Sequence, residues 1–77
     1  MEVHIVKVNG IFWSGEADAL VAPGSEGVVT ILPNHVPLVT ALKPGTVIVE
    51  KDGEKVFKHD VDHGILEVTG KRATVIL

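Results

Sequence analysis

The sequence has no cysteine, so neither a disulfide framework nor a thiolate metal site can stabilise it. That composition fits a reducing compartment. The longest apolar runs, such as residues 28–32, are far shorter than the ~20 residues that span a bilayer, and no basic-then-apolar leader opens the chain. We therefore expect a soluble domain that depends on its apolar core and on any partner that it binds.

Basic side chains are also scarce. Seven lysine and arginine residues stand against ten aspartate and glutamate residues, which gives a formal net charge of -3. Binding to nucleic acid or to an anionic membrane surface needs an excess of basic charge. Neither class of function is expected here. The aromatic residues are only Phe12, Trp13 and Phe57, which is few for a groove that binds small ligands or sugars.

What the sequence does contain is a pattern of short strands. Valine, isoleucine and threonine fill short segments, and glycine, proline, asparagine and aspartate separate them. A chain of 77 residues has room for one small domain, residues 1–77. We predict an all-β fold, a small β-sandwich or flattened barrel of about eight to ten short strands, with no C-terminal pair of helices.

Two hairpins are the clearest local predictions. The first joins residues 46–51 to 54–61 through Asp52-Gly53, a pair that suits turns in which both residues have positive φ. The second joins residues 65–69 to 73–77. Further strands are predicted to begin at Val3 and to cover residues 17–22 and 28–32, whereas residues 36–42 fit either a strand or a helical turn.

Three predicted strands contain adjacent apolar pairs, namely Ile48-Val49, Ile65-Leu66 and Val75-Ile76. Neighbouring residues of a strand point to opposite faces of the sheet. The pairs therefore indicate that some strands are covered on both sides, as two small sheets closed face to face would do.

Residues 24–45 form the most distinctive stretch. Pro33, Pro37 and Pro44 each lack a backbone donor and restrict the residue before them to extended geometry. This excludes a regular helix and predicts a rigid, partly apolar loop that a partner contacts.

The same stretch contains an ordered set of motifs. These are Gly-Ser-Glu-Gly at 24–27, Ile31, Pro-Asn-His-Val-Pro-Leu at 33–38 and Leu-Lys-Pro-Gly at 42–45. The order resembles the epsilon subunit of F-type ATP synthases, called delta in mitochondria. Residues 64–68 and 73–77 resemble the closing strands of its N-terminal domain, and residues 12–17 resemble its phenylalanine-serine-glycine turn. The resemblance covers nearly the whole chain.

The resemblance implies a non-catalytic part of the central stalk, held by the gamma subunit and seated on the membrane-embedded c-subunit ring. It implies no cofactor, no metal, and a peripheral place on the cytoplasmic face of the bacterial inner membrane, or on the matrix or stromal face in an organelle. The residues that the resemblance assigns to the subunit interface are Ser25, Glu26, Gly27, Val28, Thr30, Pro33, Asn34 and His35. Val28 stands where some relatives have an acid, and the sequence stops at Leu77, where many continue into two helices.

A metal site is the main chemical alternative, because His59-Asp60-Val61-Asp62-His63 is the densest cluster of ionisable groups. On one strand the two histidines share a face but lie roughly 13 Å apart, and ligand bonds to zinc are about 2 Å. Asp60 and Asp62 point the other way. Polar groups near a strand end are the ordinary interpretation.

Other single residues keep two interpretations. His35 is either a loop residue whose ring bonds to backbone or a partner-facing residue; as a general base it lacks a positioned nucleophile, Ser25 and Thr30 being the nearest hydroxyls. Glu26 is a partner contact or a solvated turn acid, and residues 24–27 lack the lysine of a phosphate loop. Trp13 belongs to the core or its rim, or is an exposed anchor.

Three functions follow from these observations. The first is the rotor subunit, the second is a stand-alone β-sandwich that binds a small ligand or sugar, and the third is a small metal-binding enzyme based on His59 and His63. A stable complex with gamma would favour the first, stabilisation by a saccharide the second, and stoichiometric metal the third.

Overall fold

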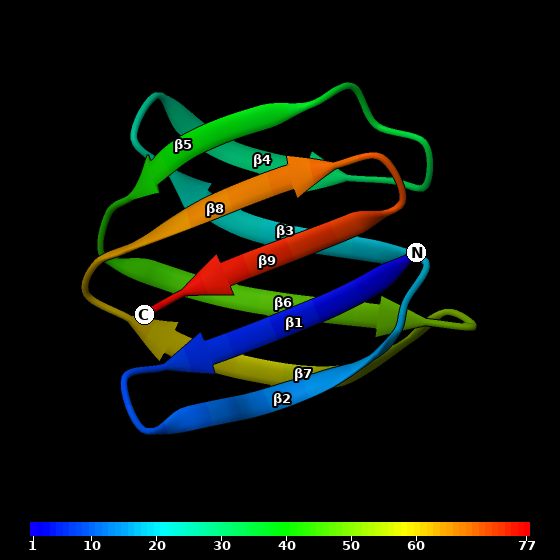
Figure 1. The fold of residues 1–77 in the computed structure, drawn as a ribbon, viewed down its shortest axis with the longest axis horizontal. Helices are drawn as coiled ribbons and strands as arrows, with labels where there is room; N and C mark the ends of the chain where they lie inside the picture. Colours follow the sequence, from blue (N-terminus) through cyan, green and yellow to red (C-terminus); the bar gives the residue numbers. More distant parts are fainter.

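The structure is a computed structural model that describes all 77 residues. It contains nine strands and no helix (Figure 1). In chain order they are β1 (Glu2–Lys7), β2 (Gly10–Glu16), β3 (Ala19–Gly24), β4 (Gly27–Ile31), β5 (Leu38–Leu42), β6 (Gly45–Lys51), β7 (Glu54–Val61), β8 (Gly64–Thr69) and β9 (Arg72–Ile76). The predicted all-β class is confirmed, and the strand number lies in the predicted range. No helix able to cross a membrane is present.

The strands form two layers. In Figure 1 the layer nearer the viewer has the order β2-β1-β9-β8-β5, and β4-β3-β6-β7 lie behind it. All strand pairs are antiparallel except β1 and β9, which are parallel. The chain passes from one layer to the other four times, after β2, β4, β5 and β7. The passage from β5 to β6 is at Lys43 and Pro44. There Gly24 pairs with Leu42, the one register pair between β3 and β5.

Alternate residues of the strands point into the space between the layers and form the core. Fourteen buried side chains make one cluster, to which nearly every strand contributes. The largest fully buried ones are Ile5, Leu20, Ile31, Leu66, Val3, Val47, Val49, Val68 and Val75. All are aliphatic, so burial of apolar surface is the main force that holds the layers together.

Both predicted hairpins are present. Asp52 and Gly53 have φ values of 53° and 78°, as the first turn requires. The strand alternative for residues 36–42 is confirmed by β5, and the boundaries of β3 and β4 differ from the predicted ones by one or two residues.

The turn expected at residues 12–17 is wrong. These residues lie mostly in β2, which pairs with β1 through Ile5–Trp13 and His4–Ser14. The turn between β1 and β2 lies earlier, at Val8 and Asn9. A bulge between Ile5 and Val6 shifts the register there, and such a shift interrupts the regular alternation by which a strand is recognised in a sequence.

The expectation that some strands with adjacent apolar residues are covered on both sides is wrong for β8 and β9. Val49, Leu66 and Val75 are buried, but their neighbours Ile65 and Ile76 are 46% and 45% exposed. Two layers enclose a single interior, so only one residue of each pair can enter it.

The pair Ile65-Leu66 offers a direct test of this arrangement. We expect Leu66→Ala to lower the free energy of unfolding by about 2–5 kcal/mol, because Leu66 is fully buried and its removal leaves a cavity. Ile65→Ala, one residue away on the outer face, should cost no more than about 1 kcal/mol. Urea denaturation followed by circular dichroism measures both. Equal losses would contradict the assigned faces of β8.

Candidate interaction surface

The structure divides the predicted interface residues into two groups at opposite ends of β4. Ser25 and Glu26 form the β3–β4 turn, with Gly27 and Val28 at the start of β4. Pro33, Asn34 and His35 lie in the connection from β4 to β5, and Thr30 is an exposed residue between the groups. Figure 1 shows the turn and the connection at the two ends of the strand. At about 3.3 Å per residue, β4 separates them by roughly 13 Å.

The first group lines a groove between β4 and β5 with a volume of about 480 Å³. The Ser25 N–H donates to the Ala41 carbonyl at 2.9 Å. The Thr40 hydroxyl donates to the Ala41 carbonyl at 3.1 Å, and the Ser25 hydroxyl lies 3.4 Å from the Thr40 hydroxyl. These bonds fix the turn against β5. Sequence reasoning missed the β5 wall of the groove, which includes Val39 and Ala41.

The groove combines polar turn atoms with apolar walls. Val28 is 71% exposed and Val39 is 68% exposed, while Ser25 and Glu26 are both exposed at the turn. Gly27 has a φ of +132°, a value that side chains rarely allow, so glycine is required where the chain enters β4. The groove can therefore contact a partner through both hydrogen bonds and apolar surface.

The second group is ordered by its own backbone. The His35 N–H donates to the Leu32 carbonyl at 3.1 Å, and His35 Nδ1 donates to the Val36 carbonyl at 2.6 Å. Asn34 has a φ of 67°, a conformation that asparagine tolerates. Of the two interpretations of His35, the structure shows the one in which the ring bonds to the loop backbone, through Nδ1. Ser25 lies at the other end of β4 from His35 and contacts Thr40, so these two side chains do not form a hydroxyl and imidazole pair for nucleophilic catalysis.

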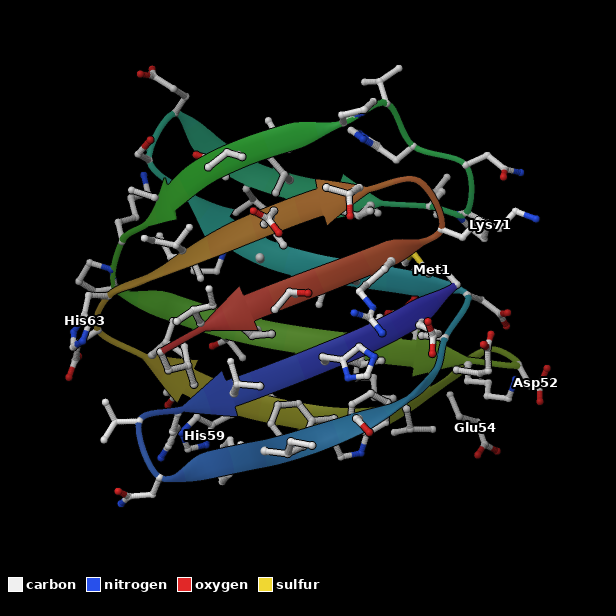
Figure 2. All side chains as sticks on the ribbon, in the orientation of Figure 1. Met1, Asp52, Glu54, His59, His63 and Lys71 are labelled. Atoms are coloured by element: carbon white, nitrogen blue, oxygen red, sulfur yellow. The ribbon has the colours of Figure 1, made fainter.

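His59 and His63 both border a depression of about 330 Å³ beside the β7–β8 turn. The His59 ring packs edge-on against Phe12, with 4.7 Å between ring centroids. In Figure 2 the two histidines are separate, and His63 lies at the edge of the molecule. No group of three or more histidine, aspartate or glutamate side chains is placed so that it could hold a metal ion. The arrangement provides no ligand set of the kind that zinc requires.

An aromatic cluster lies where β2 faces β7 without pairing to it. Phe12 contacts Phe57 edge to face at 5.6 Å, and Trp13 lies 5.7 Å from Phe57. The Lys7 ammonium lies 4.2 Å from the centre of the Phe12 ring. Trp13 is half-buried and packs against the core, as the core-or-rim interpretation expected. The aromatic residues are therefore used to close the sandwich rather than to line the groove.

These observations define a small two-layered β-sandwich whose polar groups lie at turns and on outer faces. Residues 1–77 match the family model of the ATP synthase delta/epsilon chain β-sandwich domain. The chain belongs to this family.

Curated relatives share both sequence and family. The chain is 38% identical over 76 residues to the ATP synthase epsilon chain of Brevibacillus brevis, covering 99% of this chain and 58% of the relative. It is 47% identical over 74 residues to that of Desulforamulus reducens, covering 96% of this chain and 55% of the relative. The chain thus spans somewhat more than half the length of the curated relatives it matches.

Solved structures share the fold. A chain of the Tetrahymena thermophila mitochondrial ATP synthase central stalk and c-ring matches with a TM-score of 0.82 and 15% identity, covering 99% of this chain and 61% of that one. A chain of the Euglena gracilis mitochondrial ATP synthase structure, described as OSCP/F1/c-ring, matches with a TM-score of 0.86 and 21% identity, covering 96% and 48%.

The aromatic cluster gives a prediction about the β2–β7 seam. We expect Phe57→Ala to lower the free energy of unfolding by about 1–3 kcal/mol, because ring contacts and apolar burial are both lost. Trp13 is the only tryptophan, so its fluorescence emission should shift to longer wavelength as water reaches it. Val56→Ala, at the adjacent exposed position, is the matched control and should change neither. An unshifted emission spectrum in Phe57→Ala would show that the seam does not shield Trp13.

Proposed function

We propose that this chain is a non-catalytic subunit of the rotor of a proton- or sodium-coupled F-type ATP synthase. In this role it links the gamma subunit to the c-subunit ring. The observation that supports this most directly is the match of residues 1–77 to the family's β-sandwich domain, together with curated relatives described as ATP synthase epsilon chains. On this proposal residues 1–77 are one domain, which makes and breaks no covalent bond.

The physical demand on such a subunit is stiffness. Torque that passes through a domain deforms it unless its strands are held on both edges. Here most strands have hydrogen-bonded neighbours on two sides, and the β2–β7 edge is closed by aromatic packing. A closed two-layer sandwich with a fully apolar core resists shear between its layers. The fold is therefore suited to hold two partners at a constant relative position.

The two interface groups would serve as contacts at either end of β4. Ser25, Glu26, Gly27 and Val28 offer exposed turn atoms and an apolar side chain beside the groove. Pro33, Asn34 and His35 offer a rigid connection next to the exposed Val36. Because polar loops pair best with polar turn atoms, we assign both groups, with Thr30, to the polar loops of the ring and to gamma. The subunit would then lie at the membrane surface only through the complex, on the cytoplasmic face in bacteria.

The two alternatives have less support. The aromatic residues that could form a sugar-binding platform pack against each other at the β2–β7 seam. The histidines of the metal alternative belong to no group of three or more histidine, aspartate or glutamate side chains placed to hold a metal ion.

The interface assignment can be tested with the double variant Glu26→Ala/His35→Ala. We expect the recovery of a complex with co-expressed gamma and c-ring to fall at least fivefold, because a contact is lost at each end of β4. The fold should be unchanged, since neither side chain contributes to the core. Co-purification followed by quantitative mass spectrometry measures the recovery.

Glu54→Ala/His63→Ala is the matched control. It removes the same two side-chain types at exposed positions that Figure 2 shows on opposite sides of the molecule. Recovery of the complex should equal that of the parent chain. Undiminished recovery with Glu26→Ala/His35→Ala would reject the assigned surface.

A further inference from the structure

The amino group of Met1 is bonded into the sandwich. Its ammonium donates to the Ala17 carbonyl at 3.0 Å, and the Ala17 N–H donates back to the Met1 carbonyl at 2.9 Å. Two residues that exchange both bonds in this way form a hydrogen-bonded antiparallel pair. The pair extends the ladder between β1 and β2 by one step beyond Glu2 and Glu16. Figure 2 shows Met1 at the start of β1.

The positive charge of this amino group has a carboxylate beside it. The Met1 ammonium lies 3.3 Å from the Glu16 carboxylate. The other carboxylate near the start of β1, that of Glu2, lies 3.6 Å from the Arg72 guanidinium instead. The Met1 side chain is only 3% exposed and packs against the core. A buried side chain therefore holds the ammonium in place, and hydrogen bonds and contacts that involve a charged group are stronger than neutral ones.

These contacts lie where the chain leaves the layer of β2. Ala17 is 1% exposed. The next residue, Asp18, donates its N–H to the Glu50 carbonyl of β6 in the other layer at 2.8 Å, and its carboxylate accepts from the Asp52 N–H at 2.7 Å. The passage from β2 to β3 is thus held by Met1 on one side and by β6 and its turn on the other. Most chain ends are poorly ordered, whereas this amino group helps to close one end of the sandwich.

We propose that the free ammonium of Met1 is a structural element of this fold, so that a formyl or acetyl group on its nitrogen destabilises the sandwich. An acylated nitrogen has no charge and a single N–H. It can keep the hydrogen bond to Ala17 but loses the attraction to Glu16. The acyl group also needs room beside Ala17, which has almost no exposed surface. This property is independent of the proposed function.

The inference implies that a processing reaction completes the fold. In a bacterium a newly made chain carries a formyl group on the nitrogen of its first methionine. Hydrolysis of this formyl amide consumes one water and releases formic acid, whose proton passes to the freed amine to give the ammonium and formate. Removal of Met1 itself would leave its place against the core empty, so we expect Met1 to be deformylated and then retained.

The chain of 77 residues is short enough for solid-phase synthesis. The same sequence can therefore be prepared with a free, a formylated or an acetylated Met1. We expect either acyl group to lower the midpoint of thermal unfolding, followed by circular dichroism, by at least about 4 °C. Amide hydrogen exchange gives a local measurement. Exchange at Ala17 should become at least tenfold faster relative to exchange at Lys43, whose bond to Pro23 lies in the β5–β6 connection at the opposite end of the strands (Figure 1).

The role of Glu16 is tested by combining acylation with Glu16→Gln, which removes the carboxylate charge and keeps the side-chain length. In this variant acylation should lower the midpoint less than half as much as in the parent chain, because the attraction to the ammonium is already lost. Glu54→Gln is the matched control, since Glu54 is an exposed carboxylate on β7. There the effect of acylation should equal that in the parent chain.

Each result decides for or against the inference. Equal midpoints for the free and the acylated chains would overturn it. An equal effect of acylation in Glu16→Gln and in the parent chain would reject the ion pair as its cause. Intact mass spectrometry of the chain purified from cells should show an unmodified Met1 as the first residue, and a formyl group, an acetyl group or further residues on its nitrogen would contradict the inference.

Discussion

The junction of the two sheets at β3 and β5 is the constraint on which the other features depend. The Lys43 N–H donates to the Pro23 carbonyl, and the Ser25 N–H donates to the Ala41 carbonyl, both at 2.9 Å. Directly after Lys43 the chain leaves one layer and enters the other at Pro44, whose fixed φ and missing donor suit the end of a strand. Gly45 packs directly against Pro23 there. Glycine is required at this position, because a Cβ would be 2.7 Å from the Pro23 side chain. The junction sets how the layers face each other.

From this junction the interior and the groove follow. Once β5 and β6 belong to different layers, their inward residues meet across one core, and no polar or charged side chain is buried in it. The interior therefore holds no group that could perform acid–base or nucleophilic chemistry. The bond that holds Ser25 to Ala41 joins two residues that line the groove between β4 and β5. Whatever this domain does must take place on its surface.

That surface has two chemical characters, arranged by the sheet geometry. The turn at Ser25 and Glu26 and the connection through His35 present polar atoms at the ends of β4. Ile65, Ile76 and Ile11 present exposed aliphatic side chains on the outer face of the other sheet, in line through the pairs that Val6 makes with Ile76 and Ile11. The paired strands make the domain stiff. The residues that point outward from these strands determine which partners it can bind.

The sequence by itself determined the features that depend on near neighbours in the chain. Asp52-Gly53 specifies a hairpin turn, the β-branched segments specify strands, and the motifs between Gly24 and Gly45 resemble one family, because turn chemistry and residue order are local. Only the tertiary structure decided that residues 12–17 belong mainly to a strand rather than a turn, since β1 provides the pairing edge and a bulge hides the alternation. It also decided that the interface residues fall into two groups and that Ile65 and Ile76 face outward in line. Those facts depend on which strands become neighbours and in what register, and residues far apart in the chain set both.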